Sequence, residues 1–343
     1  MASQTINGIT LVYPESPCDI FGPSVIRMQG TANRLQLDVS GGGNSFTVTY
    51  KNVSAVDISE YLQGTFSSLS MGQDIDYNDR VNYSELAQTV NITAKALDAD
   101  GTVLAQFDIE LFCIWGAPVK TGRMGAGNKI TWFRNFPMTV TIYAPTDGSI
   151  VVAEGEAVAI PSTPSLINVT MPTGTTDTEF LVQRSYQRAG RFVWIDEYVI
   201  KTDDTDEGVY LRWVDREGAW RYWLFKAVDE TRQAASVYGA WHRIDFNNYD
   251  HVDGWQGSSG RRQNFSRNDV LPLCAPLVDQ DTFDILQDVT TSPCVDMFIG
   301  GTRIQPRWTA VTVQPGSYTK DLKKPQQDFI FNLLLPETPV QQL

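Results

Sequence analysis

Histidine is nearly missing from this chain of 343 residues, which contains only His242 and His251. Most general-base, catalytic-triad and zinc chemistry depends on histidine, so this scarcity argues against the common enzyme mechanisms. Positive charge is also in short supply, because 27 Lys and Arg stand against 40 Asp and Glu and give a net charge of −13. A nucleic-acid groove needs clustered Lys and Arg against phosphate, and we therefore expect no nucleic-acid partner.

Long apolar runs and patterned cysteines are absent as well. The most apolar stretch, Leu111–Trp115, is far shorter than the ~20 residues that a membrane helix needs. The opening residues lack the basic and apolar segments of a secretory signal, so we expect synthesis in a cytoplasm and no membrane insertion. The cysteines have no metal-ligand spacing and are expected to be reduced thiols in the core. They are Cys18, Cys113, Cys274 and Cys294.

Strand patterns dominate what is present. Apolar and polar residues alternate in Phe46–Tyr50 and Thr139–Tyr143, and every second residue is apolar from Val103 to Leu111. Turn-forming residues such as Asp98–Gly101 separate these runs. Only Leu277–Val289 has a helical pattern of apolar residues. We therefore predict a mainly β fold with one or two short helices, arranged as two antiparallel β-sandwich or barrel-like domains.

A proline-containing segment divides the chain. Residues 151–164 are rich in Ala, Glu and Gly and end in Ile160–Pro164, where two prolines flank small polar residues. This composition favours an extended linker. We predict an N-terminal β domain over residues 1–160, used for assembly, and a C-terminal β-sandwich over 161–343. The second domain is Trp-rich, because six of the nine Trp fall between Trp194 and Trp255.

The strongest local pattern is a β-hairpin. Val209–Val214 and Ala219–Phe225 are joined by Asp215–Gly218, with glycine at a position that tolerates a positive φ. Large residues occupy both faces of the hairpin, so both faces are expected to be covered, by the core or by a neighbouring subunit. The candidates for this core or interface role are Trp213, Trp220, Tyr222 and Trp223.

A glycine-rich loop, Lys120–Lys129, is the second interface candidate. It is not a phosphate loop, because Asn128 stands where that motif needs lysine and strand-like sequence follows. We expect a flexible loop that becomes ordered on assembly, with Arg123, Met124 and Lys129 as contact residues.

Polar clusters elsewhere predict turns more than metal sites. Asp203–Gly208 lacks the spacing of an EF-hand loop and is expected to be a solvated acidic turn, with a weak calcium site as the alternative. The segment around Tyr249 contains both histidines and several Asp, and a loop is favoured there over a metal site. Most residues of the small basic groups around Arg184 and Arg261 are expected to be solvated. We predict no catalytic residue, metal or cofactor.

Three stretches of the sequence resemble tail-region proteins of phages and prophages of Bacteroidetes bacteria. The first runs from Ile114–Val119 to Trp132–Pro137, the second is the hairpin Gly208–Phe225, and the third extends from Ala275 to Phe331. The order of these stretches is also similar to that of distal-tail or baseplate-hub proteins. The resemblance implies an N-terminal β domain that forms a ring, a C-terminal β-sandwich and a place in the virion tail. It transfers no catalytic residues.

Our first hypothesis is therefore a structural virion protein, not an enzyme, that assembles as a homo-oligomeric ring with other phage tail proteins. The alternative is a carbohydrate-binding adhesion module that contacts glycans on the host surface. Its candidate residues are Trp241, Tyr249 and Trp255, because aromatic rings stack on sugar faces. A glycan hydrolase would need two carboxylates across a cleft, and no spacing in the sequence identifies such a pair.

Overall fold

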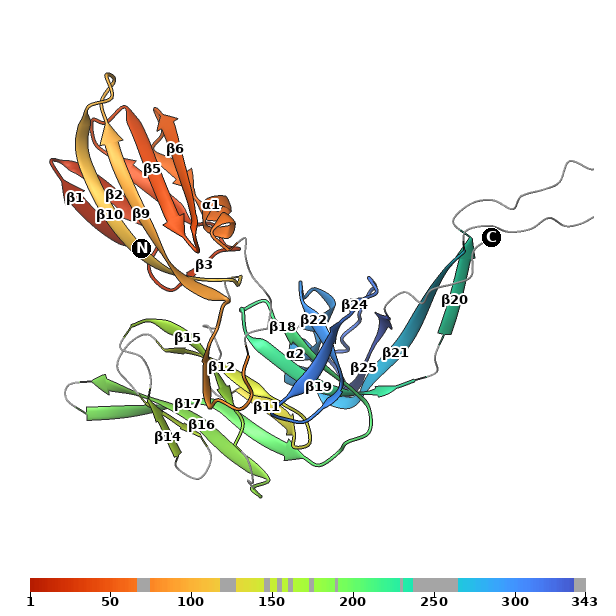
Figure 1. The fold of residues 1–343 in the computed structure, drawn as a ribbon. Coiled ribbons are helices and arrows are strands. Elements are labelled where there is room, and N and C mark those ends of the chain that lie inside the picture. The colour runs from red at the N-terminus through yellow and green to blue at the C-terminus, as the bar shows by residue number, and fades with distance from the viewer. Residues whose placement is uncertain are drawn as a thin grey trace, which may run out of the picture.

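The computed structural model describes residues 1–66, 75–117, 128–144, 149–152, 156–159, 163–172, 176–188, 191–228, 231–236 and 265–335. Over these residues the fold is mainly β, with two short α-helices and one short 3-10 helix, which confirms the predicted fold class. Figure 1 shows two bodies. We call them the first lobe (residues 1–66 and 87–114) and the second lobe (residues 75–86 and the described residues of 128–335).

The first lobe is a sandwich of two sheets whose inner faces share one core. Leu11, Leu37 and Phe107 come from different strands of both sheets and are almost completely buried. Apolar and polar residues alternate along these strands because successive side chains point to opposite faces. One sheet has the order β1 (Ala2–Ile6), β2 (Ile9–Tyr13), β4 (Val25–Gln29) and β7 (Ala55–Asp57). The other has the order β3 (Cys18–Asp19), β10 (Val103–Ile114), β9 (Ala87–Leu97), β5 (Arg34–Gly41) and β6 (Asn44–Lys51).

Helix α1 (Ser59–Gly64) covers the inner side of β6. The ring of Tyr61 lies 6.1 Å from that of Phe46, and its hydroxyl is 3.0 Å from that of Tyr50. In the first lobe the neighbouring strands are antiparallel except β3 and β10, which are parallel.

The second lobe contains three sheets. The first has the order β11 (Asn128–Phe133), β17 (Arg191–Asp203), β16 (Glu179–Arg188), β13 (Ser149–Val152) and β14 (Glu156–Ala159). The second has the order β12 (Thr139–Ala144), β15 (Ser165–Thr170) and β8 (Val81–Tyr83). The third is barrel-like, with the order β23 (Pro306–Ala310), β22 (Val295–Gly301), β18 (Val209–Val214), β19 (Trp220–Ala227), β21 (Phe265–Asp279), β25 (Gln326–Leu334) and β24 (Thr312–Val313). Strand β20 (Thr231–Ser236) pairs with β21 beside this path.

The boundary predicted between residues 160 and 161 does not separate two sheets. Strands β12 and β15 lie on either side of it and pair along their whole length, from Thr139↔Thr170 to Ala144↔Ser165. The core of the second lobe also contains side chains from both sides, such as Ile142 and Ile167. Prolines and small polar residues mark turns as well as linkers, and composition alone does not distinguish the two. Strand pairing and core packing therefore place the division between the two lobes near Ile114.

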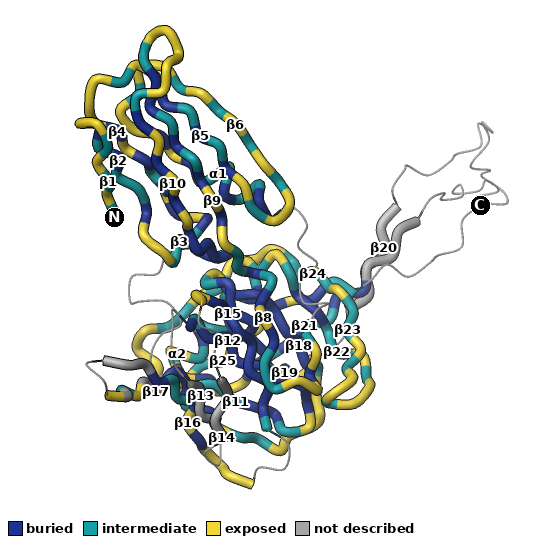
Figure 2. Tube along the Cα trace, turned by 60° about the vertical axis from the view of Figure 1, so that its left-hand side comes forward, coloured by how far each residue is buried: buried dark blue, intermediate teal, exposed yellow. Residues whose placement is uncertain are grey.

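The lobes are joined through a shared apolar contact. The last residues of β10, including Phe112 and Ile114, are buried in the core of the second lobe, and Trp115 packs against both cores. Figure 2 shows buried residues continuing along β9 and β10 from the first lobe into the second.

The predicted helix is present in part. Helix α2 spans Gln280–Gln287 and continues as a 3-10 turn over Asp288–Thr290, so it begins three residues later than Leu277. Asp279 caps it by accepting a hydrogen bond from the backbone N–H of Thr282 at 2.8 Å. The predicted apolar face is confirmed, because Phe283, Leu286 and Val289 are all buried. Among the described residues, no helix is long and apolar enough to cross a membrane.

Candidate functional site

The Trp-rich hairpin lies in the interior of the second lobe. Strands β18 and β19 pair from Val209↔Phe225 to Val214↔Trp220, as predicted. One face packs into the core that contains Trp220 and Tyr222, and the other packs into a second core with Trp213. These three candidates have exposed fractions of 2%, 7% and 0%, so the chain itself provides the cover on both faces. Trp213, Trp220 and Tyr222 were expected either to pack in the core or to contact a neighbouring subunit, and in this structure they pack in the core.

Arg212 is the charged residue in the middle of this hairpin. Its guanidinium carbon is 4.9 Å from the ring centroid of Trp220 and 4.4 Å from that of Trp308. Its Nε donates to Oδ2 of Asp296 at 2.9 Å. Burial by itself would lower the pKa of Arg212, and the charge of Asp296 acts in the opposite direction. The arginine is therefore held as a cation inside an aromatic cage.

Three hydroxyl groups extend this polar network through the core. Nη1 of Arg212 donates to the Tyr77 hydroxyl at 2.9 Å, which is 3.1 Å from the hydroxyl of Tyr222. The Tyr222 hydroxyl in turn is 2.9 Å from Oγ1 of Thr139. Burial raises the pKa of Tyr222, so the phenol remains neutral and available as a hydrogen-bond donor. The network connects β12, β18 and β19 with the segment that contains Tyr77, all distant in sequence, which indicates a structural role.

The turn of the hairpin, Asp215–Gly218, forms a contact at the junction of the two lobes. Oδ2 of Asp215 accepts from Nε of Arg221 at 2.6 Å, and Oδ1 accepts from the backbone N–H of Ala219. The rigid turn presents the carbonyl of Arg216, which accepts a hydrogen bond from the N–H of Ala117 at 2.6 Å. The segment that follows β10, where the two lobes meet, is thus bonded directly to the turn of the hairpin.

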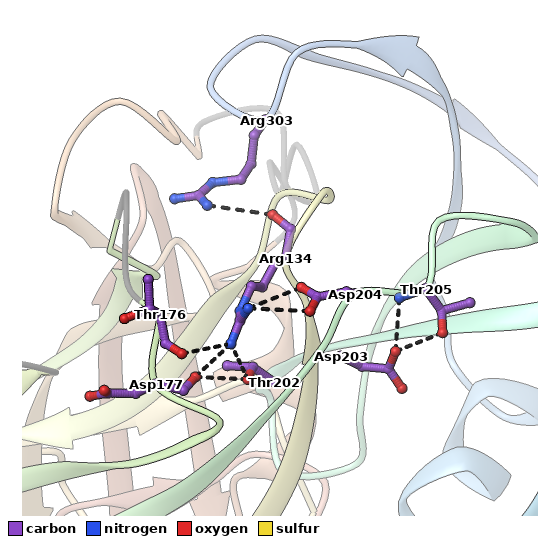
Figure 3. A network of polar contacts seen from close by, with 8 residues as sticks. All are labelled: Arg134, Thr176, Asp177, Thr202, Asp203, Asp204, Thr205 and Arg303. Atoms are coloured by element: carbon purple, nitrogen blue, oxygen red, sulfur yellow. Dashed lines mark hydrogen bonds and ion pairs between the residues drawn. The ribbon is translucent and has the colours of Figure 1, made fainter.

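The acidic turn Asp203–Gly208 is organised by an arginine that the sequence did not single out (Figure 3). Nη1 of Arg134 lies 3.0 Å from Oδ1 of Asp204, and Nη2 donates to the carbonyl of Asp177 at 2.7 Å. Hydrogen bonds from Thr205 lower the pKa of Asp203. Residues 204–208 are exposed, in agreement with a solvated turn. Within the described part of the chain, no group of His, Cys, Asp and Glu could hold a metal ion.

One arginine of the small basic groups, most of which were expected to be solvated, is largely shielded from water. Nε of Arg184 donates to Oε1 of Glu197 at 2.6 Å, and the side chains are only 13% and 7% exposed. The pair connects β16 to β17, where a bulge shifts the register, so the charge is satisfied within the sheet. Arg191, by contrast, is exposed as expected.

Lys129 and Trp223 lie together in a cleft, which we call the Lys129 cleft. It has a volume of about 410 Å³ and lies between the β11–β17–β16 face and the rim of the barrel-like sheet. Lys129 is exposed on the sheet side, and Trp223 is half-buried on the barrel side. These residues are 94 positions apart, so only the fold reveals their proximity. The remaining candidates lie outside the described residues; they are Arg123, Met124, Trp241, Tyr249 and Trp255.

Charges of both signs line the Lys129 cleft. Lys129 and Lys201 face it together with Glu179, Asp203 and Asp279. The hydrogen bond from the N–H of Thr282 and the charge of Lys129 both lower the pKa of Asp279. Asp203 and Asp279 are therefore both ionised at neutral pH, whereas a glycosidase acid needs a raised pKa. The arrangement is suited to hydrogen bonding with a polar ligand.

The class that fold and site define is a two-lobed, mainly β protein with a structural aromatic core and a polar cleft. Comparison with protein-family models and with curated proteins finds no match to this chain.

Proposed function

We propose that the protein is a structural subunit of a bacteriophage tail, in a distal-tail or baseplate ring, that assembles symmetrically with its own copies and with other tail proteins. The resemblance of three stretches of sequence to tail-region proteins supports this function. The single observation that carries the assembly role is the open edge of strand β6 in the first lobe.

Strand β6 ends its sheet and pairs only with β5 among the described strands. Its eight residues, Asn44–Lys51, include one charged side chain, Lys51, and no proline. Monomeric proteins protect such an edge with charges, prolines or bulges, because its free N–H and C=O groups can pair with another chain. A regular, nearly uncharged edge of this length is therefore suited to pairing with a strand of a neighbouring subunit.

The turn before β6 determines which backbone groups point outward. Gly42 and Gly43 both have positive φ, +55° and +82°, as in a two-residue type I′ turn. Such a turn places Gly41 and Asn44 in a hydrogen-bonded pair, and bonded and non-bonded pairs then alternate along the hairpin. The bond from Asn52 N–H to the Asn33 carbonyl, 2.8 Å, continues the same alternation. Ser45, Thr47 and Thr49 consequently direct their N–H groups away from β5.

A projecting two-stranded arm gives further support. Residues Phe265–Asp269 of β21 pair with β20, whereas the pairing of β21 with β25 begins only at Val270. The two strands extend away from the rest of the second lobe (Figure 1). An isolated two-stranded ribbon is only marginally stable in water. Cover by a neighbouring subunit would stabilise it.

The decisive variant is Thr49→Pro. Proline removes an outward N–H and leaves the bonds to β5 in place, so it blocks pairing at the edge with little effect on the lobe. Thr49→Val is the matched control, since it keeps the N–H. We expect the wild type and Thr49→Val to form rings or high oligomers in mass photometry, alone or with neighbouring tail proteins, and Thr49→Pro to remain monomeric with an unchanged melting temperature.

Two results would contradict the proposal. One is a wild type that stays monomeric even when neighbouring tail proteins are added. The other is a folded Thr49→Pro variant that assembles as well as Thr49→Val. Electron microscopy of the assembled particle tests the place in the tail, because labelled subunits should lie in the tip of the tail.

A further inference from the structure

The Lys129 cleft has the size and the mixed lining of a ligand site. Its volume of about 410 Å³ lies within the range of small-molecule pockets, ~300–1,000 Å³. The register of the sheet places Lys129 beside Val199 and Thr131 beside Lys201, so polar and apolar groups alternate over its floor. The opposite wall includes the half-buried ring of Trp223.

A strained residue stands at the mouth of this cleft. Leu277 has a φ of +51°, and its side chain is 67% exposed. A left-handed backbone is unfavourable for a residue with a side chain, and an exposed leucine gains nothing from burial to offset that cost. A bulge between Ala275 and Val278 and a bond from its N–H to Asp328 hold the residue there. Strain of this kind is typical of functional sites.

The charges of the cleft compensate one another. Lys201 pairs in register with Thr131 on one side and Glu179 on the other, and Lys129 lies close enough to Asp279 to affect its ionisation. The lining therefore offers donors and acceptors without an excess of positive charge that would select an anion. A ligand that combines hydroxyl groups with an apolar face matches both kinds of lining, and sugars have this combination.

We propose that the Lys129 cleft binds a neutral saccharide. Trp223 and Leu277 contact the C–H face of the sugar ring. Lys129, Lys201 and Glu179 form hydrogen bonds with its hydroxyl groups. This activity goes beyond assembly and does not depend on it, because the cleft and the open edge of β6 belong to different lobes.

Saturation-transfer NMR with the full chain tests the proposal. The probes are glucose, galactose, N-acetylglucosamine, maltose, cellobiose and chitobiose, with N-acetylneuraminic acid as the anionic sugar. We expect at least one neutral sugar to bind. Leu277→Gly should weaken its affinity roughly fivefold or more, although it relieves backbone strain and leaves thermal stability equal or higher. Lys201→Met should weaken binding in the same way.

Two control variants leave the cleft intact. Asn52→Gly changes another residue with positive φ, 53°, but in the first lobe, and Lys226→Met removes an exposed lysine of β19 outside the cleft. Both should bind sugar as the wild type does. The proposal is overturned if no sugar of the panel binds, if the anionic sugar is preferred, or if Leu277→Gly and Lys201→Met bind normally. None of these results would alter the outcome of the Thr49→Pro experiment.

Discussion

Arg212 and Asp296 lie directly opposite each other on β18 and β22 and form an ion pair that is almost closed to solvent. Their side chains are 4% and 11% exposed. A charged pair with this degree of burial contributes little net stability, because desolvation offsets most of the attraction. The ion pair instead specifies the register of the two strands. Any other register of β22 on β18 would leave a charge unpaired among aromatic rings. The pair therefore favours one arrangement of strands in a core of otherwise interchangeable apolar residues.

Removing only one partner of this pair should be costly. Arg212→Met leaves Asp296 buried without its cation and is expected to destabilise the protein by about 3–5 kcal/mol. The double variant Arg212→Met/Asp296→Leu should recover most of that loss. Urea denaturation measures both. Lys95→Met is the control, since Lys95 and Asp38 are 28% and 32% exposed and such a pair contributes about 1 kcal/mol or less. A double variant no more stable than Arg212→Met would contradict this account.

The contact between the lobes depends on a glycine. Gly218 has a φ of +79°, and a Cβ there would lie 2.5 Å from the carbonyl oxygen of Trp115. Gly43 is the matched control, because its φ is +82° and nothing lies within 4 Å of its Cβ position. Gly43→Ala should cost about 1–2 kcal/mol through backbone strain alone. Gly218→Ala should cost about 2 kcal/mol more, since it also displaces Trp115, which packs against the cores of both lobes. Equal losses in thermal denaturation would show that the contact is dispensable.

Local patterns predicted the parts of the fold that local interactions determine. The hairpin of β18 and β19 follows from two alternating runs around a Gly-containing turn, and the face of α2 follows from the spacing of Phe283, Leu286 and Val289. The boundary predicted between residues 160 and 161 was chosen from composition alone. Composition does not reveal the pairing of β12 with β15 across that position, because this pairing is a long-range interaction.

The candidate site was predictable only in fragments. Lys129 and Trp223 were chosen for separate reasons, a loop and an aromatic hairpin, and the fold brings them into one cleft. Leu277 carried no signal, because a positive φ at a leucine is imposed by the bulge in β21 and is not visible in the residue type. Arg212, by contrast, could have been identified from the sequence. A lone arginine between aromatic and aliphatic residues, in a strand covered on both faces, must find a buried partner.

The four cysteines should differ in reactivity from one another. Cys18 and Cys113 are adjacent and buried on β3 and β10, and Cys274 and Cys294 are half-buried. The hydrogen bond with Cys18, together with burial, raises the pKa of Cys113, and burial raises that of Cys294 to about 12. Thiolates are the reactive form, so alkylation by iodoacetamide at about pH 8 should be slow at all four. Mass spectrometry should find Cys274 modified first and Cys113 last, and modification of Cys113 before the protein unfolds would contradict the structure.

Asp288 should make the protein less stable as the pH rises. It lies at the C-terminal end of α2, where a negative charge is unfavourable, and burial together with nearby Asp215 raises its pKa from 3.8 to about 6. Between about pH 4 and pH 6 the unfolded chain loses this proton first, so the free energy of unfolding falls by up to about 3 kcal/mol. Arg216, 3.8 Å away and 63% exposed, offsets only part of this effect.

The test compares Asp288→Asn with the wild type in guanidinium denaturation at a series of pH values. The neutral side chain cannot lose a proton, so the variant should be more stable than the wild type at about pH 7 and equally stable at about pH 4. Asp281→Asn, at an exposed position of the same helix, is the control. Its stability relative to the wild type should not change with pH in this way. A stability difference between Asp288→Asn and the wild type that stays constant over this range would mean that the Asp288 carboxyl titrates normally in the folded protein, and the burial argued for it would then be incorrect.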